Sequence, residues 1–321
     1  MGEYVTKMQR RDGRWAPLRG NWATLLLPIA ADDAIEFGAL AEEIVVLIAA
    51  GVDGIYSNGT AGEFHNQTEA EFDAIQQLLA EKCASAGMPF VIGACQPDPR
   101  IALERVRRAA ALAPSGIQVI LPDWWPLTDP EAVDFLGMAA EAAGNVPLIL
   151  YNPPHAKRVL KPAELAAILA QVPQVVGVKL GDGDDQWYGE AKRLLDDCAL
   201  YVPGHHLATG VRHGVAAGAF SNVACLSPSG AQRWTEMMLT DIEAALDIER
   251  RICRFMDEHI VPFRRDHGYS NAALDKLLAA IGNWAPVGTR LRRPYRWIEQ
   301  EAALPLRELA RSIVPEIMNR I

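Results

Sequence analysis

Two polar residues of complementary chemistry stand where two apolar segments end. The apolar run 146–150 leads into Tyr151, and the run 175–178 leads into Lys179, 28 residues further on. Short apolar runs bounded by Pro and Gly predict buried parallel strands, so each polar residue is expected at the carboxyl end of its strand. A lysine buried there becomes costly to charge, and its pKa is expected to fall. The neutral amine can then attack a ketone and form a Schiff base, while the tyrosine hydroxyl transfers protons.

A glycine-rich turn supplies a second part of the predicted site. It follows an apolar run at 52–58 and consists of Gly59, Thr60, Ala61, Gly62 and Glu63. Glycines let backbone N–H groups approach a ligand, and such groups can hold a carboxylate, with the Thr60 hydroxyl at the same rim. The alternative for this segment is an ordinary strand-to-loop turn, and the alternative for Lys179 is a lysine that only ends its strand and extends to solvent.

The composition restricts the class of protein. The chain has 321 residues, of which 50% are hydrophobic, and a formal net charge of −9. This size allows one large α/β barrel with an ample core, and the negative charge argues against nucleic acid or an anionic membrane as the main partner. The segment 1–20 lacks the apolar core of a signal peptide, and no apolar run reaches membrane-spanning length. Five cysteines without a C-x-x-C pair favour reduced thiols and a cytoplasmic protein.

Strand-like and helix-like segments alternate along most of the chain. Eight such units in this length predict a TIM (β/α)8 barrel rather than an open sheet. Helices are expected between the strands, including one behind a capping box at 68–71 and one over 205–217. The expected strands cover residues 22–27, 52–58, 89–95, 117–121, 146–151, 175–179, 200–203 and 219–225.

The residues after the eighth strand are too many for one helix. Amphipathic patterns at 242–260, 272–281 and 304–317 predict a C-terminal appendage of three helices. The sequence is therefore interpreted as an N-terminal extension (1–20), the barrel (21–238) and a C-terminal helical region (239–321).

With these residues in place, the chain resembles the dihydrodipicolinate synthase / N-acetylneuraminate lyase family of Schiff-base aldolases, from about Leu18 to the C-terminal helices. The most specific parts are the turn 59–63, the segment Tyr151-Asn152-x-Pro154 and the segment Gly177-Val178-Lys179. The resemblance implies a barrel with three C-terminal helices, assembled as a homotetramer that is a dimer of dimers. It also implies that Lys179 forms a Schiff base with pyruvate or a related 2-oxo acid, that Tyr151 shuttles protons, and that Thr60 relays or orients them. Neither a metal nor a cofactor is expected.

Four departures from the family pattern fall around the predicted site. Ala61 stands where the family usually has a threonine, and Trp124 stands in the region where the synthases carry an interfacial tyrosine pair. Ala156 stands near the position of the synthases' carboxylate-binding arginine, with two basic residues just beyond. Gly204-His205-His206 replaces a glycine with acidic neighbours. These departures argue against dihydrodipicolinate synthesis and leave the Schiff-base chemistry intact.

The predicted substrate contacts surround these positions. His205 and His206 lack a third ligand at useful spacing, so a polar rim is favoured over a metal site. Trp124 is expected either to pack at an interface or to form a wall for an extended substrate. The predicted catalytic residues are Lys179, Tyr151 and Thr60. The predicted substrate-binding residues are Gly59, Ala61, Gly62, Asn152, His155, Lys157, Gly204, His205 and Trp124.

The leading hypothesis is a lyase that acts on pyruvate or a related 2-oxo acid through an adduct on Lys179. Its reaction would be aldol cleavage or condensation, or dehydration of a 2-keto-3-deoxy sugar-type acid. Within the same family, 4-hydroxy-tetrahydrodipicolinate synthase is the alternative enzyme. A paralogue that binds a 2-oxo acid without turnover is the alternative from another class of protein.

Overall fold

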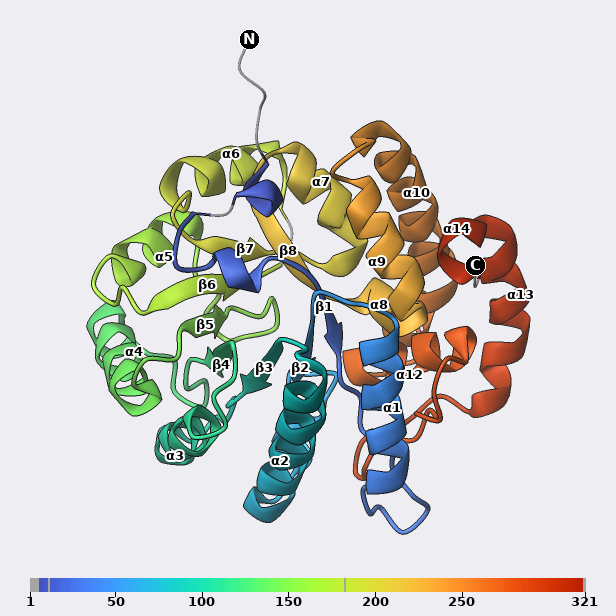
Figure 1. Ribbon diagram of the computed structural model, residues 1–321, viewed down its shortest axis with the longest axis horizontal. Helices are drawn as coiled ribbons and strands as arrows, with labels where there is room; N and C mark the ends of the chain where they lie inside the picture. The colour runs from blue at the N-terminus through green and yellow to red at the C-terminus, as the bar shows by residue number, and fades with distance from the viewer. Residues whose placement is uncertain (1–5, 11, 182, 320–321) are drawn as a thin grey trace.

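Eight parallel strands form a closed barrel, in which each strand lies beside the next in sequence and β8 returns to β1 (Figure 1). This closed barrel confirms the predicted TIM (β/α)8 fold. The computed structural model describes residues 6–10, 12–181 and 183–319. The strands are β1 (Gly20–Thr24), β2 (Gly54–Ser57), β3 (Phe90–Gly93), β4 (Gly116–Ile120), β5 (Leu148–Tyr151), β6 (Val175–Lys179), β7 (Ala199–Tyr201) and β8 (Ala216–Ser221).

The barrel interior is filled by large side chains. Trp22, Tyr56, Tyr201 and Phe220 are each at most 5% exposed, and the Phe220 ring centroid lies 4.5 Å from that of Tyr56 and 4.6 Å from that of Tyr201. Residues before β1 close the amino end, where the Leu18 carbonyl accepts hydrogen bonds from the Trp22 indole (2.8 Å) and the Tyr201 hydroxyl (2.7 Å). Because the described residues pack this end, we look for a ligand site at the carboxyl ends of the strands.

Helices surround the barrel and bury their apolar faces against the strands. The capping box expected at the start of α2 is confirmed, since the Thr68 hydroxyl accepts a hydrogen bond from the Glu71 amide and the Glu71 carboxylate accepts one from the Thr68 amide. The helices of the βα units are α1 (Phe37–Ala49), α2 (Glu69–Ala86), α3 (Pro99–Ala110), α4 (Asp129–Ala143), α5 (Pro162–Leu169), α6 (Asp185–Leu194), α7 (Leu207–Arg212), and α8 (Asn222–Leu226) with α9 (Pro228–Met237).

The predicted boundaries of the last βα unit were wrong. The eighth strand was expected at 219–225, but β8 spans Ala216–Ser221 and the apolar residues after it form α8. Ser221 ends the strand by capping α8, because its hydroxyl accepts a hydrogen bond from the Ala224 amide. The helix expected over 205–217 is reduced to α7, which stops before Gly214, whose φ of 71° is left-handed. Apolar character alone did not separate strand from helix here.

The C-terminal region contains the three expected helical segments in a more broken form. The first runs from α10 (Ile242–Phe255) through a π-helical turn (Met256–Ile260) into α11 (Val261–Arg265). The second is α12 (Asn271–Gly282), which packs against α8 beside β1 (Figure 1). The third is α13 (Ala303–Ile313), followed by α14 (Pro315–Met318). Among the described residues, no helix combines the length and apolar character that a membrane crossing requires.

A buried ion pair fastens α12 to the turn after β2. The Lys276 ammonium lies 2.8 Å from the Glu63 carboxylate, and both side chains are at most 2% exposed. Lys276 also donates to the Arg290 carbonyl (2.5 Å), while the second Glu63 oxygen accepts from the Arg292 amide (3.1 Å). Glu63 itself has a left-handed φ of 51°, which is uncommon for a residue with a side chain. Tertiary contacts therefore hold the turn in its shape.

Removal of one partner of this pair is expected to destabilise the fold strongly. Lys276→Ala leaves the Glu63 carboxylate buried without its cation, which costs about 3–5 kcal/mol of unfolding free energy. Arg311→Ala breaks an exposed pair with Glu308 and should cost less than about 1 kcal/mol. Urea unfolding of both variants measures the difference, and equal midpoints would contradict the assigned role of the buried pair.

Candidate active site

Lys179 lies at the centre of the open end of the barrel, in a cage of aromatic rings. Its amine is 2.9 Å from the Tyr56 hydroxyl and 4.3 Å, 4.7 Å and 5.3 Å from the ring centroids of Tyr151, Tyr56 and Phe220. Burial among these rings lowers the pKa of Lys179 to about 8, against an opposing effect of Cys95, Asp275 and Cys225. A substantial fraction of this amine is therefore neutral near physiological pH.

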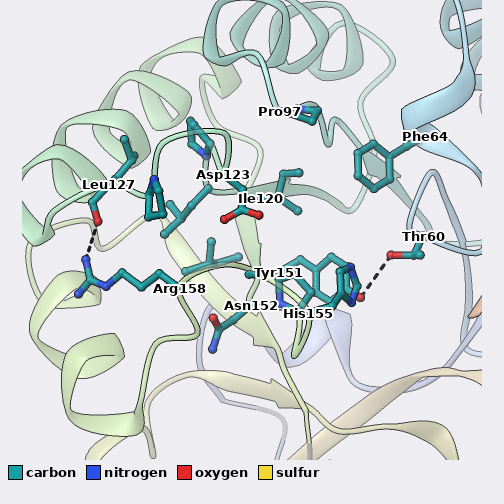
Figure 2. Close-up of a pocket in the computed structure, with 16 residues that line it drawn as sticks. Thr60, Phe64, Pro97, Ile120, Asp123, Leu127, Tyr151, Asn152, His155 and Arg158 are labelled. Carbon is teal, nitrogen blue, oxygen red and sulfur yellow. Dashed lines mark hydrogen bonds between the residues drawn. The ribbon is translucent and has the colours of Figure 1, made fainter. Parts of the chain in front are cut away.

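Tyr151 stands directly beside Lys179, because the two residues are register partners on adjacent strands β5 and β6. Its hydroxyl is 3.4 Å from the Thr60 hydroxyl, the contact drawn in Figure 2. Burial raises the pKa of Tyr151 to about 12, with the Thr60 hydrogen bond acting in the other direction. The structure thus brings the three predicted catalytic residues together, from β5, β6 and the turn after β2.

The turn after β2 is shaped by the need to admit the Tyr56 side chain. A Cβ on Gly59 would lie 1.5 Å from the Tyr56 hydroxyl, so a side chain there would displace the group that bonds to Lys179. A Cβ on Gly62 would lie 2.9 Å from the Asn58 amide nitrogen. These two glycines allow the chain to fold tightly against β2 and to place Thr60 at the rim.

Three adjoining cavities open around this centre. The first, of about 170 Å³, lies beside Tyr151 and reaches Arg158 (Figure 2). The second, of about 470 Å³, extends from Thr60 towards the C-terminal region, and the third, of about 310 Å³, contains Lys179 and Asp275. Thr60 lines the first and second cavities, and Tyr151 lines the first and third. A substrate bonded to Lys179 therefore has room to extend in more than one direction.

Seven of the predicted substrate-binding residues lie at these cavities or in the turn that borders them. Asn152 lines the first cavity, but its side chain is bonded to the Leu160 amide and carbonyl, so it holds the following loop. His155 lines the first and second cavities, and partial burial lowers its pKa. Gly204 and His205 line the third cavity, where the Asn222 Nδ2 atom lies 2.9 Å from the His205 Nδ1 atom. Ala61 is buried in the turn, with Gly59 and Gly62 on either side.

Trp124 and Lys157 instead lie outside the lining of the three cavities. The Trp124 side chain is 86% exposed, and the Lys157 ammonium donates to the Trp124 carbonyl (2.8 Å) and lies 4.9 Å from its ring centroid. Arg158, which follows in the chain, lines the first cavity, but its guanidinium is already paired with Asp129 and Glu164. Neither basic residue is free of protein partners to take the place of the synthases' arginine.

Sequence reasoning missed three residues at the centre of the site. Tyr56 and Phe220 face the barrel interior from β2 and β8 and form part of the Lys179 cage. Asp275 reaches the third cavity from α12. The period of two along each strand was the available signal for the two aromatic residues, whereas nothing local in the sequence separates Asp275 from an acidic residue on a solvent-facing helix.

Comparisons with known proteins identify the family of this chain. The chain belongs to the dihydrodipicolinate synthetase family, whose family model matches residues 17–313. An uncharacterized DapA-like lyase of Halobacterium salinarum is 28% identical over 199 residues, which cover 62% of this chain and 64% of the relative. A 4-hydroxy-tetrahydrodipicolinate synthase of Stenotrophomonas maltophilia (strain K279a) is 27% identical over 249 residues, which cover 75% of this chain and 81% of the relative.

Solved structures share the fold at low sequence identity. YagE of Escherichia coli K12, a prophage protein of the dihydrodipicolinic acid synthase family determined in complex with pyruvate, has a TM-score of 0.80 at 19% identity, covering 92% of this chain and 98% of that chain. N-acetylneuraminate lyase of Fusobacterium nucleatum has a TM-score of 0.79 at 18% identity, covering 93% of this chain and 99% of that chain. Among the described residues, no group of three or more His, Cys, Asp or Glu is placed to hold a metal ion.

The aromatic cage predicts an unusual titration of Lys179. In the folded protein, its reactivity towards a trace acylating reagent should rise with a midpoint near pH 8, because burial lowers its pKa to about 8. In urea-unfolded protein the same lysine should return to the ordinary value of ~10.4. Peptide mass spectrometry after labelling across a pH series measures both midpoints, and identical midpoints in the two states would contradict the cage.

Proposed function

We propose that the protein is a lyase of the class I aldolase type, in which Lys179 forms a Schiff base with pyruvate or a related 2-oxo acid. The observation that carries the proposal is the position of Lys179, half-buried among three aromatic rings beside a buried tyrosine. An amine with a pKa of about 8 is a competent nucleophile near neutral pH. Membership of the dihydrodipicolinate synthetase family and the likeness to YagE, solved with pyruvate, support the same chemistry.

The turn after β2 is the proposed binding place for the carboxylate of the 2-oxo acid. In the described part of the chain, the backbone N–H groups of Ala61 and Gly62 donate no hydrogen bond, so both are available to an anionic ligand. Ala61 offers no side-chain hydroxyl, and the carboxylate would rely on these amides and on the Thr60 hydroxyl. Successive backbone donors of this kind bind anions without a charged side chain.

Tyr151 is the proposed proton carrier. Its ring centroid lies 4.3 Å from the Lys179 amine and its hydroxyl lies 3.4 Å from the Thr60 hydroxyl, which supports a role in moving protons to and from an adduct on the amine. Its raised pKa of about 12 keeps it protonated in the resting protein. Deprotonation of Tyr151 therefore has to be coupled to a step in which another atom releases or takes up the proton.

The second part of the substrate distinguishes the possible reactions. Aldol cleavage, aldol condensation and dehydration of a 2-keto-3-deoxy sugar-type acid all proceed from the same Lys179 adduct. We favour a hydroxylated 2-oxo acid over aspartate semialdehyde, because Ala156 supplies no charge and the Arg158 guanidinium is paired with two carboxylates. The synthase and the non-catalytic binding protein remain the alternatives. A screen of 2-keto-3-deoxy acids for pyruvate release, with aspartate semialdehyde and pyruvate in a parallel condensation assay, separates the three.

The proposed assembly and location are independent of this chemistry. A homotetramer built as a dimer of dimers and a cytoplasmic location are predictions from the family resemblance and from the cysteine usage. Light scattering on the purified protein and fractionation of the source cells would test them.

Borohydride reduction in the presence of pyruvate is expected to attach a three-carbon unit to Lys179. Peptide mapping by mass spectrometry locates the modification, and Lys179→Met serves as the control that removes the amine while keeping an unbranched apolar side chain. An adduct on another lysine, or none at all, would overturn the proposed function.

Tyr151→Phe is expected to lower turnover by ~10²–10⁴-fold, the usual contribution of a positioned acid–base group. The matched control is Tyr201→Phe, which removes a buried hydroxyl at the opposite end of the barrel, where it bonds to the Leu18 carbonyl. This control should keep its kcat, although it loses stability. Unchanged kcat in Tyr151→Phe would show that another group transfers the proton.

A further inference from the structure

Asp275 is an acidic residue that lines the third cavity and has no role in the function proposed so far. It is half-buried on α12 and lines the cavity together with Lys179 and Tyr151. Its neighbour Lys276 points to the other side and is paired with Glu63, so α12 presents the carboxyl group to the cavity and the ammonium to the turn. In the described part of the chain, the Asp275 carboxyl group makes no hydrogen bond, and Lys179 is the charged group that acts on it.

The groups that face Asp275 come from several elements. Its charge acts on Lys179 of β6, on Tyr56 of β2, on Tyr151 of β5 and on Cys225 of α8. Burial raises the pKa of Asp275 to about 7, with Lys179 opposing the rise. Three further titratable or charged residues line the same cavity: His205, Asp257 and Arg264. Asp275 is thus a carboxylic acid that exchanges a proton near neutral pH and lines the same cavity as the Lys179 amine.

Schiff-base formation requires an acid at this place. After the amine adds to a ketone, the carbinolamine hydroxyl must leave as water, and this needs a proton delivered two bonds away from the lysine nitrogen. With a pKa of about 12, Tyr151 holds its proton more tightly than Asp275, whose pKa is about 7. Trp124, in the region where the synthases carry a second tyrosine, is 86% exposed and has no hydroxyl. The leaving hydroxyl is carried by C2, the atom bonded to the Lys179 nitrogen, and Lys179 and Asp275 line the same cavity.

We propose that Asp275 is a further catalytic residue, the proton donor for carbinolamine dehydration and the proton acceptor in the reverse hydrolysis. The proposal rests on the proposed Schiff-base function. Neutral Lys179 bonds to C2 of the 2-oxo acid, and a proton moves from nitrogen to the former carbonyl oxygen. Asp275 then gives its proton to that hydroxyl, the C2–O bond breaks, water leaves, and the nitrogen lone pair forms the iminium. The carboxylate left on Asp275 faces the new cation, and hydrolysis returns the proton as water adds.

Rapid-quench borohydride trapping with pyruvate measures the rate of adduct formation directly. At pH 7.5, Asp275→Asn is expected to form the adduct ~10²-fold more slowly than the wild type, the usual range for loss of a positioned general acid. The wild-type rate should rise with pH as Lys179 loses its proton and fall again as Asp275 loses its own. In Asp275→Asn the falling limb should be absent. In Asp275→Ala, added formate should restore the rate, because the cavity of about 310 Å³ admits a small acid.

Asp257→Asn is the matched control, since Asp257 lines the rim of the same cavity but is exposed. It should form the adduct at the wild-type rate. Equal rates in wild type and Asp275→Asn, or a slow Asp275→Ala that formate does not rescue while its falling limb persists, would overturn the role of Asp275 and leave the proposed function standing. If the wild type forms no adduct with pyruvate, the proposed function fails and the role of Asp275 fails with it.

Discussion

The cost of keeping an ammonium among aromatic rings is the constraint on which the open end of this barrel depends. Among the described residues, Lys179 has the Tyr56 hydroxyl as its hydrogen-bond partner and forms no ion pair, so burial favours its neutral form. Several elements of the barrel contribute to that environment. β2 and β5 supply tyrosine rings, β8 supplies Phe220, and Gly59 leaves the space that the Tyr56 hydroxyl occupies. The side chains that fill this end of the barrel therefore also lower the pKa of the Lys179 amine.

Lys276 is a second buried lysine, and unlike Lys179 it is paired with a carboxylate. It is fully buried, but it faces the Glu63 carboxylate at 2.8 Å and two further oxygen contacts fix the pair in place. Burial lowers the pKa of Lys276 as well, but the Glu63 carboxylate opposes this effect, and the pair holds α12 against the turn. The C-terminal region is thus part of the site, since one turn of α12 both fixes the Thr60 loop and supplies Asp275.

The sequence predicted the parts of the site that lie at strand ends. Tyr151 and Lys179 each follow an apolar run, and adjacent parallel strands in register place such residues side by side. Tyr56 was missed because an aromatic residue inside an apolar strand has the pattern of a core residue, and its contact with Lys179 depends on closure of the barrel. Asp275 was missed because only the packing of α12 on α8 turns it inwards. For β8, continuous apolar character hid the change from strand to helix at Ser221.

Burial brings the pKa values of Asp275 and Lys179 close together. For an ordinary aspartic acid and lysine, holding the proton on the acid while the amine is neutral costs ~9 kcal/mol, from pKa values of ~3.9 and ~10.4. With pKa values of about 7 and about 8 for Asp275 and Lys179, the same arrangement costs only about 1–2 kcal/mol. A cavity that disfavours both charges therefore raises the population of the protonation state in which the amine is neutral and the acid holds its proton. Burial is the largest cause of both pKa shifts, and because the two groups carry opposite charges, both shifts favour that state.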